Sequence, residues 1–562
     1  MRASRRRAMI LFLALLSVYV VARVFHLWLL PEPKWGAEEI VHGVLPFHLQ
    51  HGLVMPLGAY QFDIYAGGSL VVGVLAAPFF AWLGPNYLAL QLSAWLLSIV
   101  TAAFLLALAW RLFGRPAAVA MAVALVAAPA VHVKWSLAAL GNHMAIGFFI
   151  VAGFWLLDRW FRSPLRKSPV SVRHVGFVFG IGAVLGFAVW FEYEFLAAFA
   201  AMGFLAIVTA PSRKTIIVEA LALLAGLRVG LQPWYSFHGG RSFIKYMAGF
   251  FSGLGGGPSV EIGSYNDATL FLKAVTVHFL QLFGDRDLFL HQGVAIPVVF
   301  FNILTYAGFA AAWIIVAWST RGAWRKLAAR LRGVPVEWSW QLFGAVLAAF
   351  VPAYLIVYAL HPSYLPIPPR RYLFSLYPII FLLIAAGVHL LWQAKRRWAA
   401  GIVLGLFALG GLGGQLGVYQ SSKHGFATDT PGYDYRYFHE VLGHHYQFDL
   451  DFDKYAETAQ EAYGDRRPDF LEGFCIGVAH WSGEYEVEWY LAQGRERERE
   501  AAEAFIVGVG AASVSVPATR LKDSGELWPR GPAWQQAAIG RGRELAARFV
   551  PVGHNLEPQN LQ

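Results

Sequence analysis

Two adjacent carboxylates stand in a polar stretch that follows the first apolar block of the chain. Glu38 and Glu39 lie within the segment 35–43, which reads WGAEEIVHG, and the apolar block ends near Leu30. A carboxylate beside an apolar rim can have a raised pKa because burial disfavours its charged form, and such a group suits general-base catalysis. The alternative is that both acids are merely hydrated in an exposed loop.

Other polar and aromatic side chains are candidates for binding a substrate. In the same stretch these are His42, Tyr60, Gln61 and Tyr65, ahead of the sequence Gly67-Gly68-Ser69. Much later, Arg370 and Arg371 precede Tyr372 at the start of an apolar block. Arginine suits phosphate binding because its planar guanidinium can hold two oxygens at once. The alternative is that both arginines only anchor a helix at the lipid headgroups.

Three further residues stand close to apolar blocks. Glu192 and Glu194 lie where two short blocks meet, and an acid there is costly unless it is paired or used, so site and structural roles are both open. His143 flanks a polar turn and either helps to bind phosphate or is simply hydrogen-bonded at the interface.

The single cysteine, Cys475, excludes an intramolecular disulfide and a cysteine-based zinc site. No cofactor is indicated, and a divalent metal remains open.

The elements that must position these residues are membrane helices. Of the 562 residues, 57% are hydrophobic and 14% are charged, whereas roughly a quarter of a soluble protein is charged. The apolar residues form blocks of about 17–25, the length that spans a bilayer. We expect eleven spans, at about 8–30, 86–113, 116–133, 142–161, 174–192, 194–210, 215–235, 295–319, 339–360, 372–393 and 398–420. Residues 69–84 are predicted to form a short helix that dips into the outer interface.

Basic residues predict the orientation of this all-α bundle. With the N-terminus in the cytoplasm, every predicted inner loop carries Lys or Arg, as the positive-inside rule requires. Segments 31–85, 134–141, 236–294, 361–371 and the tail then lie outside. The net charge of +10 arises from these clusters, which lack an amphipathic basic face, so nucleic acid is not an expected partner. The first apolar block is predicted to be an uncleaved span rather than a signal peptide, since no clear cleavage site follows it.

The sequence divides into two predicted domains. Residues 1–420 form the transmembrane part, and residues 421–562 change to charged and polar composition without a spanning block. The tail contains a weak repeat, with Phe470-x-x-Gly473, Phe505-x-x-Gly508 and Ala537-x-x-Gly540 spaced 35 and 32 residues apart. Such a period is typical of stacked helical pairs. We therefore expect a soluble, helical, repeat-like domain outside the membrane, although three imperfect copies can arise by chance.

The polar stretch resembles the first outer loop of GT-C superfamily membrane glycosyltransferases, in the bacterial branch related to protein mannosyltransferases and lipid A sugar transferases. That loop often reads Trp-x-x-Asp-Glu-Ala-x-x-Gly, then Gly-x-x-Pro, then Tyr-Gln-x-x-Tyr-x-Gly-Ser. The match covers Trp35 to Ser69 and runs on to Gly84. The segment 370–378, RRYLFSLYP, is similar to the Arg-Tyr-Leu-x-x-Leu-Tyr-Pro that opens a late span in those enzymes. The resemblance implies a GT-C-like fold over residues 8–420.

The resemblance also implies a reaction and roles for the residues. A carboxylate at the outer face removes a proton from an acceptor hydroxyl, which attacks the anomeric carbon of a sugar on a polyprenyl phosphate. The base position falls on Glu38, where the family usually has Asp, and Glu39 matches an acid that orients or binds. Arg371 matches the arginine that meets the phosphate, with Arg370 and Tyr372 beside it. The longer Glu38 puts the acceptor geometry, and activity itself, in question.

The expected function is therefore inverting sugar transfer from a polyprenyl-phosphate donor to an envelope glycan, lipid or protein, in a bacterial inner membrane. The first alternative is a catalytically inactive relative that acts as a scaffold or binds lipid, which the Asp-to-Glu change favours. A lipid-linked oligosaccharide transporter is less compatible, because the acids and arginines gather at one face instead of spreading through the membrane. Nucleotide-driven chemistry lacks support, since no Walker motif is present.

Overall fold

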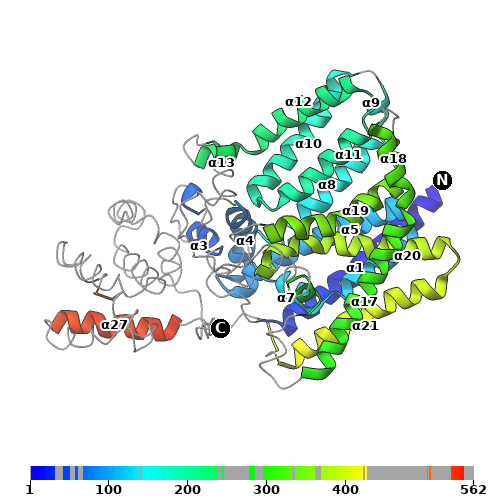
Figure 1. Ribbon diagram of the computed structural model, residues 1–562. Helices are drawn as coiled ribbons and strands as arrows, with labels where there is room; N and C mark the ends of the chain where they lie inside the picture. The colour runs from blue at the N-terminus through cyan, green and yellow to red at the C-terminus, as the bar shows by residue number, and fades with distance from the viewer. Residues whose placement is uncertain are drawn as a thin grey trace.

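The computed structural model describes residues 2–31, 42–50, 57–60, 67–139, 142–168, 170–237, 242–245, 278–284, 295–331, 336–360, 369–421, 424–426, 503, 506–507 and 533–549 (Figure 1). Every regular element within these ranges is helical, which agrees with the predicted all-α class. The α-helices are α1 (Arg2–Leu29), α3 (Val44–Gln50), α4 (Gly68–Leu83), α5 (Tyr87–Phe113), α6 (Arg115–Val126), α7 (Ala130–Trp135), α8 (Ile146–Phe161), α9 (Pro164–Lys167), α10 (Val172–Phe191), α11 (Phe195–Val208), α12 (Arg213–Gly230), α13 (Gln232–Phe237), α17 (Ala295–Ser319), α18 (Arg321–Leu331), α19 (Trp340–Leu360), α20 (Tyr377–Gln393), α21 (Arg397–Ser421) and α27 (Ala533–Phe549). Short 3₁₀ turns are η1 (Leu57–Tyr60), η3 (Leu280–Leu282) and η5 (Pro369–Leu376).

Seven helices of the described part are long and apolar enough to cross a membrane. They fall at Arg6–Leu29, Tyr87–Phe113, Val172–Phe191, Val299–Ser319, Trp340–Ala359, Tyr372–Gln393 and Arg397–Tyr419. Gly68–Leu83, Arg115–Val126 and Phe195–Val208 are apolar but shorter. The pattern is that of a multi-pass membrane protein. Each of the eleven predicted blocks contains a helix, yet the count of eleven spans is not established by helix length and composition.

Two predicted spans are interrupted. The block 116–133 contains α6 and α7, separated around Pro129, which precedes α7 with φ −50° and ψ 143°. Proline lacks the N–H of a helical hydrogen bond and pushes the preceding residue out of the helical region, so the chain turns here. The block 215–235 likewise divides into α12 and α13, and Pro233 lies in the first turn of α13. Interruption brings polar side chains of α7 inside the bundle.

The bundle is built around α20, whose apolar residues are almost completely buried against α5, α6, α17, α19 and α21. A second layer contains α8, α10, α11 and α12, seen in the upper part of Figure 1. Glycine allows α10 and α12 to touch through their backbones. A Cβ added at Gly226 would lie 2.0 Å from the carbonyl oxygen of Phe179, and one at Gly182 would lie 2.3 Å from that of Leu223. Small residues spaced four apart are a common basis of helix pairing in membranes.

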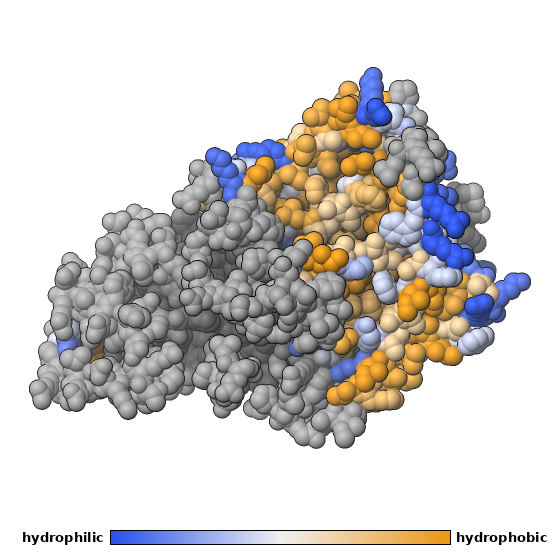
Figure 2. All heavy atoms as spheres, in the orientation of Figure 1, coloured by the Kyte–Doolittle hydropathy of each residue, from blue (hydrophilic) through white to orange (hydrophobic). Residues whose placement is uncertain are grey.

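One end of the bundle, here called the basic end, collects positive side chains. In Figure 2 the orange apolar surface over the helices gives way to blue residues along the edge formed by the N-terminus, α9 and α18. Buried acids tie the helices together there. Asp158 accepts hydrogen bonds from Arg111, from Arg162 at 2.7 Å and from Trp338 at 2.9 Å, and it is fully buried. The clustering matches the predicted inner loops, and orientation in a membrane remains a prediction.

A second ionic group at the basic end joins α9, α10, α11 and α12. Arg166 is buried and contacts Glu219 at 3.3 Å, the Thr209 hydroxyl at 2.9 Å and the Ala206 carbonyl at 3.0 Å. His174 Nε2 lies 3.4 Å from the same Glu219 carboxylate. Because each charge has a partner, burial here is compensated. These contacts explain the short α9 as a structural tie.

The predicted C-terminal domain falls mostly outside the described residues. Within them, α27 contains the third copy of the predicted repeat, and Arg541 contacts Glu503 at 3.0 Å. The first copy, at Phe470 and Gly473, lies outside the described ranges. A domain boundary near residue 421 therefore stays a prediction.

Candidate functional site

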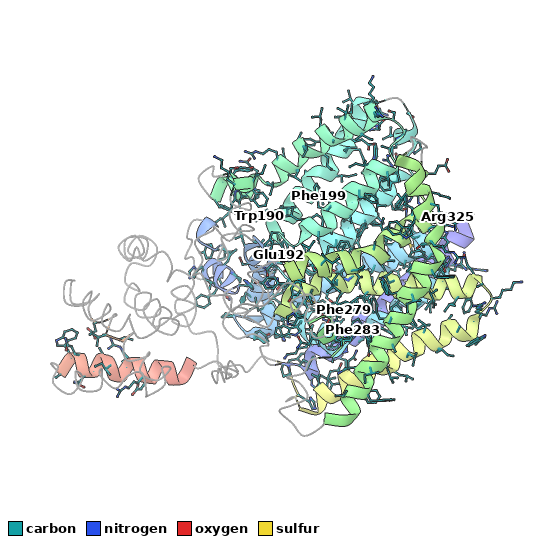
Figure 3. The ribbon with its side chains drawn as sticks, viewed as in Figure 1. Trp190, Glu192, Phe199, Phe279, Phe283 and Arg325 are labelled. Carbon is teal, nitrogen blue, oxygen red and sulfur yellow. The ribbon has the colours of Figure 1, made fainter. Side chains whose placement is uncertain are left out.

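Two buried acids occupy the turn that joins α10 to α11. Glu192 ends α10 in an extended conformation, with φ −159° and ψ 122°, and Glu194 precedes the first residue of α11. Glu192 is fully buried and Glu194 is 7% exposed. The backbone N–H of Glu194 lies 3.4 Å from Oε1 of Glu192. Figure 3 shows Glu192 at one end of the helices and Arg325 of α18 at the other, so this end, here called the site end, lies opposite the basic end.

His143 supplies the third buried polar group. It lies in the turn before α8, where the Asn142 side-chain oxygen accepts a hydrogen bond from its backbone N–H at 2.9 Å. Its Nδ1 atom lies 2.9 Å from Oε1 of Glu194, and both side chains are 3% exposed. A hydrogen bond to a carboxylate is stronger than one between neutral groups, especially away from water. The contact fixes the start of α8 against the start of α11.

The acids connect to the segment that carries the predicted phosphate-binding arginines. Tyr354 of α19 donates to the carbonyl of Tyr372 at 2.7 Å and accepts from the Ser375 hydroxyl at 2.8 Å, while its oxygen lies 3.5 Å from Oε2 of Glu194. The rings of His143 and Tyr372 meet edge to face, with centroids 5.0 Å apart. A continuous polar chain therefore runs from His143 through Glu194 and Tyr354 to η5.

The first predicted outer loop returns to the same place. The Gly67 N–H donates to the carbonyl of Trp190 at 2.7 Å. Trp190 lies two residues before Glu192, and Figure 3 shows Trp190 and Glu192 close together. A Cβ at position 67 would lie 2.2 Å from the Trp190 ring. Only glycine fits such a contact without displacing the ring. The glycine motif thus seats the end of the loop beside the acids.

Two predicted site residues in this loop have structural surroundings. His42 is buried and donates from Nδ1 to the carbonyl of Ala139. Burial lowers its pKa to about 4, and the bond to Ala139 opposes that shift. Tyr60 is also buried, and its hydroxyl lies 2.8 Å from Nδ1 of His48, which is itself fully buried on α3. Both residues hold the cap formed by α3, η1 and α4.

The predicted site residues fall into three groups. His143, Glu192 and Tyr372 come together at the site end, whereas His42 and Tyr60 lie in the adjoining cap. Arg370 and Arg371 belong to η5, of which the structure describes the backbone but not these side chains. Glu38, Glu39, Gln61 and Tyr65 lie outside the described residues, so their roles stay predictions.

Several residues of the polar chain were absent from the predicted site. Tyr354 and Ser375 carry no motif of their own, and Asn142 looks like an ordinary turn residue. Glu194 shared the signal of Glu192, an acid between apolar blocks, but its pairing with His143 is visible only in three dimensions. For Tyr354, the sequence signal that could have been used is a hydroxyl inside a predicted apolar span, which needs a polar partner there.

The cluster also contains ligand types that suit a divalent cation. One ligand atom from each of His143, Glu192 and Glu194 lies within 4.8 Å of the others. Imidazole nitrogen and carboxylate oxygen bind zinc, and carboxylates suit magnesium and manganese. The His143–Glu194 hydrogen bond gives one polar atom of each of these two residues a partner without a metal. Within the described residues this group is the one arrangement of three such side chains.

Comparison with known proteins gives a distant match. No family model matches the sequence, and no curated protein matches it. Among solved structures, the apo oligosaccharyltransferase of Archaeoglobus fulgidus aligns with a TM-score of 0.42 and 15% identity over 81% of this chain. The alignment covers 60% of that protein, so this chain spans less than two thirds of its length. The functional assignment therefore rests on the residues of the chain itself.

Proposed function

We propose that the protein is a membrane glycosyltransferase that moves a sugar from a polyprenyl-phosphate donor to an envelope acceptor at the site end of the bundle. The observation that supports this proposal is the polar chain His143–Glu194–Tyr354–Tyr372. It joins the segment of Arg370 and Arg371 to the buried acids. The loop of Glu38 and Glu39 ends beside the same acids at Gly67. The end of that loop at Gly67, the buried acids and η5 therefore meet at one end of the bundle.

The proposed reaction uses Glu38 as a general base. Its carboxylate takes the proton of the acceptor hydroxyl while that oxygen bonds to the anomeric carbon. The bond from this carbon to the phosphate oxygen breaks, and its electron pair leaves with the polyprenyl phosphate, so the anomeric configuration inverts. Arg371 stabilises the added charge on the phosphate, an interaction that grows stronger as the bond breaks. Glu39 orients the acceptor.

The buried cluster has a positioning role in this proposal. Tyr354 holds the backbone of Tyr372, and Glu194 with His143 holds Tyr354 and the ring of Tyr372. The two arginines directly precede Tyr372 in η5, so their guanidinium groups depend on the same backbone. Small displacements of such groups lower the rate because the donor must be aligned for in-line attack. Glu192 lies two residues after Trp190, which accepts the hydrogen bond of Gly67.

The orientation follows from the charge pattern. Placing the basic end in the cytoplasm puts the site end, and the proposed C-terminal domain from about residue 421, outside a bacterial inner membrane. Polyprenyl-linked sugars then reach the site from the lipid.

An inactive scaffold or lipid-binding protein is the second candidate, and the observation that favours it is the glutamate at position 38, where the resembled family usually has aspartate.

The test is transfer by the purified full-length protein in proteoliposomes. A panel of polyprenyl-phosphate hexoses with a tritiated sugar serves as donor, and cell-envelope extract serves as acceptor. We expect a labelled product and the release of one polyprenyl phosphate for each sugar transferred. Arg371→Ala should reduce both donor binding and turnover, whereas Arg228→Ala, which changes an exposed arginine near the end of α12, should not. A folded wild-type protein that transfers no sugar from any donor of the panel would favour the scaffold.

A further inference from the structure

A second polar group lies deeper in the bundle, and the proposed reaction does not use it. Arg23 of α1 is 1% exposed, although it lies within an apolar helix six residues before Leu29. At 1.5 Å per residue, that separation is roughly 9 Å along the helix. Its side chain does not reach water at the helix end but points to α7. Placing a guanidinium inside a membrane bundle is costly unless the charge is compensated.

The partners of Arg23 within the described residues are all neutral. One terminal nitrogen donates to the Ser136 hydroxyl at 2.7 Å, and the other lies 3.5 Å from the Val133 carbonyl and 3.4 Å from Nδ1 of His26. The guanidinium also lies 5.9 Å from the centroid of the Tyr19 ring. Its Nε–H is buried without a hydrogen-bond partner, and no ion pair joins Arg23 to a described carboxylate. Among the described residues, the Arg23 guanidinium therefore has no counter-ion.

His132 provides a second, independent observation. This side chain of α7 is 8% exposed, and its Nδ1 atom is buried without a hydrogen-bond partner. Its ring is held edge to face by Tyr377 at 4.7 Å and Phe381 at 5.0 Å, so it cannot turn away freely. A buried polar atom without a partner costs free energy that a bound ligand would recover. Two such atoms, on Arg23 and His132, belong to adjacent helices.

A cavity lies beside this group, next to Ser136, the hydrogen-bond partner of Arg23, although Arg23 itself is not among its lining residues. Tyr19, His132 and Ser136 line it, together with Ser98 and Thr101 of α5. Its volume is about 40 Å³ for water centres, and a single water needs roughly 10–15 Å³ on that measure. The space therefore suits a group of a few heavy atoms. Met144 and Phe374 also line it; Met144 directly follows His143 in the sequence, and Phe374 lies two residues after Tyr372.

We propose that Arg23, His132, Ser136 and Tyr19 form an anion site that binds a phosphate group. A phosphate monoester brings the negative charge that Arg23 lacks, and its oxygens accept from the guanidinium, the hydroxyls and the imidazole. None of the described carboxylates contacts Arg23, so none of them competes with a bound phosphate. The phosphate is carried either by a membrane lipid or by free inorganic phosphate. This site is separate from the proposed donor arginine Arg371 and stands whether or not the protein transfers sugar.

Binding is tested with farnesyl monophosphate, its alcohol farnesol and inorganic phosphate. The full-length protein in detergent carries Arg371→Ala throughout, so that the proposed donor position does not contribute. Titration calorimetry should show that Arg23→Gln weakens binding of the phosphate ligand roughly tenfold to a hundredfold. This is the loss of affinity expected when a hydrogen bond to a charged group is removed. Arg23→Lys should retain part of the affinity, and the matched control Arg228→Gln should retain all of it.

The ligands separate the two sources. Arg23-dependent binding of farnesyl phosphate alone assigns the site to a lipid phosphate, and equal Arg23-dependent binding of inorganic phosphate assigns it to the free ion. Unchanged affinity of both in a folded Arg23→Gln protein overturns the proposal, as does binding of farnesol as tight as that of its phosphate. If Arg23→Gln does not fold, cryo-electron microscopy of the wild-type protein with farnesyl phosphate tests the site instead. Phosphate density beside Arg23 Nε supports the site, and its absence at saturation refutes it.

Discussion

The Nδ1 atom of His143 lies 2.9 Å from a carboxylate oxygen of Glu194, 51 residues further along the chain, and both side chains are almost completely buried. This pair joins the turns that begin α8 and α11. Through Tyr354 it reaches the carbonyl of Tyr372 and thus the segment with the two arginines. The relationship makes the buried acids part of one polar chain.

Tyr354→Phe should damage this chain with little change in shape. The substitution removes the hydroxyl that donates to Tyr372 at 2.7 Å and accepts from Ser375 at 2.8 Å. Because the partners stay buried, we expect a loss of about 1–3 kcal/mol in stability. Thermal unfolding in detergent measures the loss, and donor titration should show weaker binding. Tyr306→Phe is the matched control, since ring contacts alone are seen for Tyr306; equal stability of the two variants would contradict the account.

Gly67→Ala should disturb the seat of the first loop. The added Cβ would lie 2.2 Å from the Trp190 ring, so the ring or the loop must move. We expect lower sugar transfer and a lower unfolding temperature. Gly180→Ala is the control, because no atom beyond its chain neighbours and the backbone of its own helix lies within 4 Å of a Cβ there, and alanine favours a helix. Normal transfer by Gly67→Ala would show that the loop does not need this contact.

Stability should fall in mild acid because of His42. Its folded-state pKa of about 4 lies below the ordinary 6.5, so between these values the unfolded chain binds the extra proton and the folded protein does not. The stabilisation is present above pH 6.5 and is lost as the pH falls toward 4. From pH 6.5 to 5 this group contributes a loss of roughly 2 kcal/mol. Chemical denaturation at pH 6.5 and at pH 5 measures the change in the free energy of unfolding. His42→Gln should reduce this pH dependence. The same pH dependence in the variant would assign the effect to other groups.

Much of the helical framework could be predicted from sequence because bilayer-length apolar blocks dictate helices. The block 372–393, for example, contains α20 preceded by η5. The division of 116–133 at Pro129 was missed, since apolar composition continued across the break. His143 and Glu192 were predicted as separate candidates. The contact of Tyr354 with Glu194, which links it to His143, could not be predicted, because the two residues lie 160 positions apart and the contact depends on how the helices pack.

Topology can be measured directly. A reporter fused after residue 430 should behave as extracytoplasmic, since eleven spans from a cytoplasmic N-terminus place the tail outside. A reporter inserted after Arg325, in the helix at the basic end, should behave as cytoplasmic. Each fusion serves as the control for the other when both are measured in the same strain background. A cytoplasmic signal from the fusion after residue 430 would mean that residues 69–84 span the membrane or that another predicted span does not.

The most direct measurement compares Glu38→Gln with the wild type in single-turnover transfer and in donor binding. Glutamine keeps the shape and hydrogen bonding of the side chain but cannot accept the proton. General-base catalysis typically contributes about 10²–10⁴-fold, so transfer should fall by that order while affinity for the polyprenyl-phosphate donor is retained. Glu38→Asp should retain transfer if this position matches the aspartate of the resembled family. Undiminished transfer by Glu38→Gln would contradict the account.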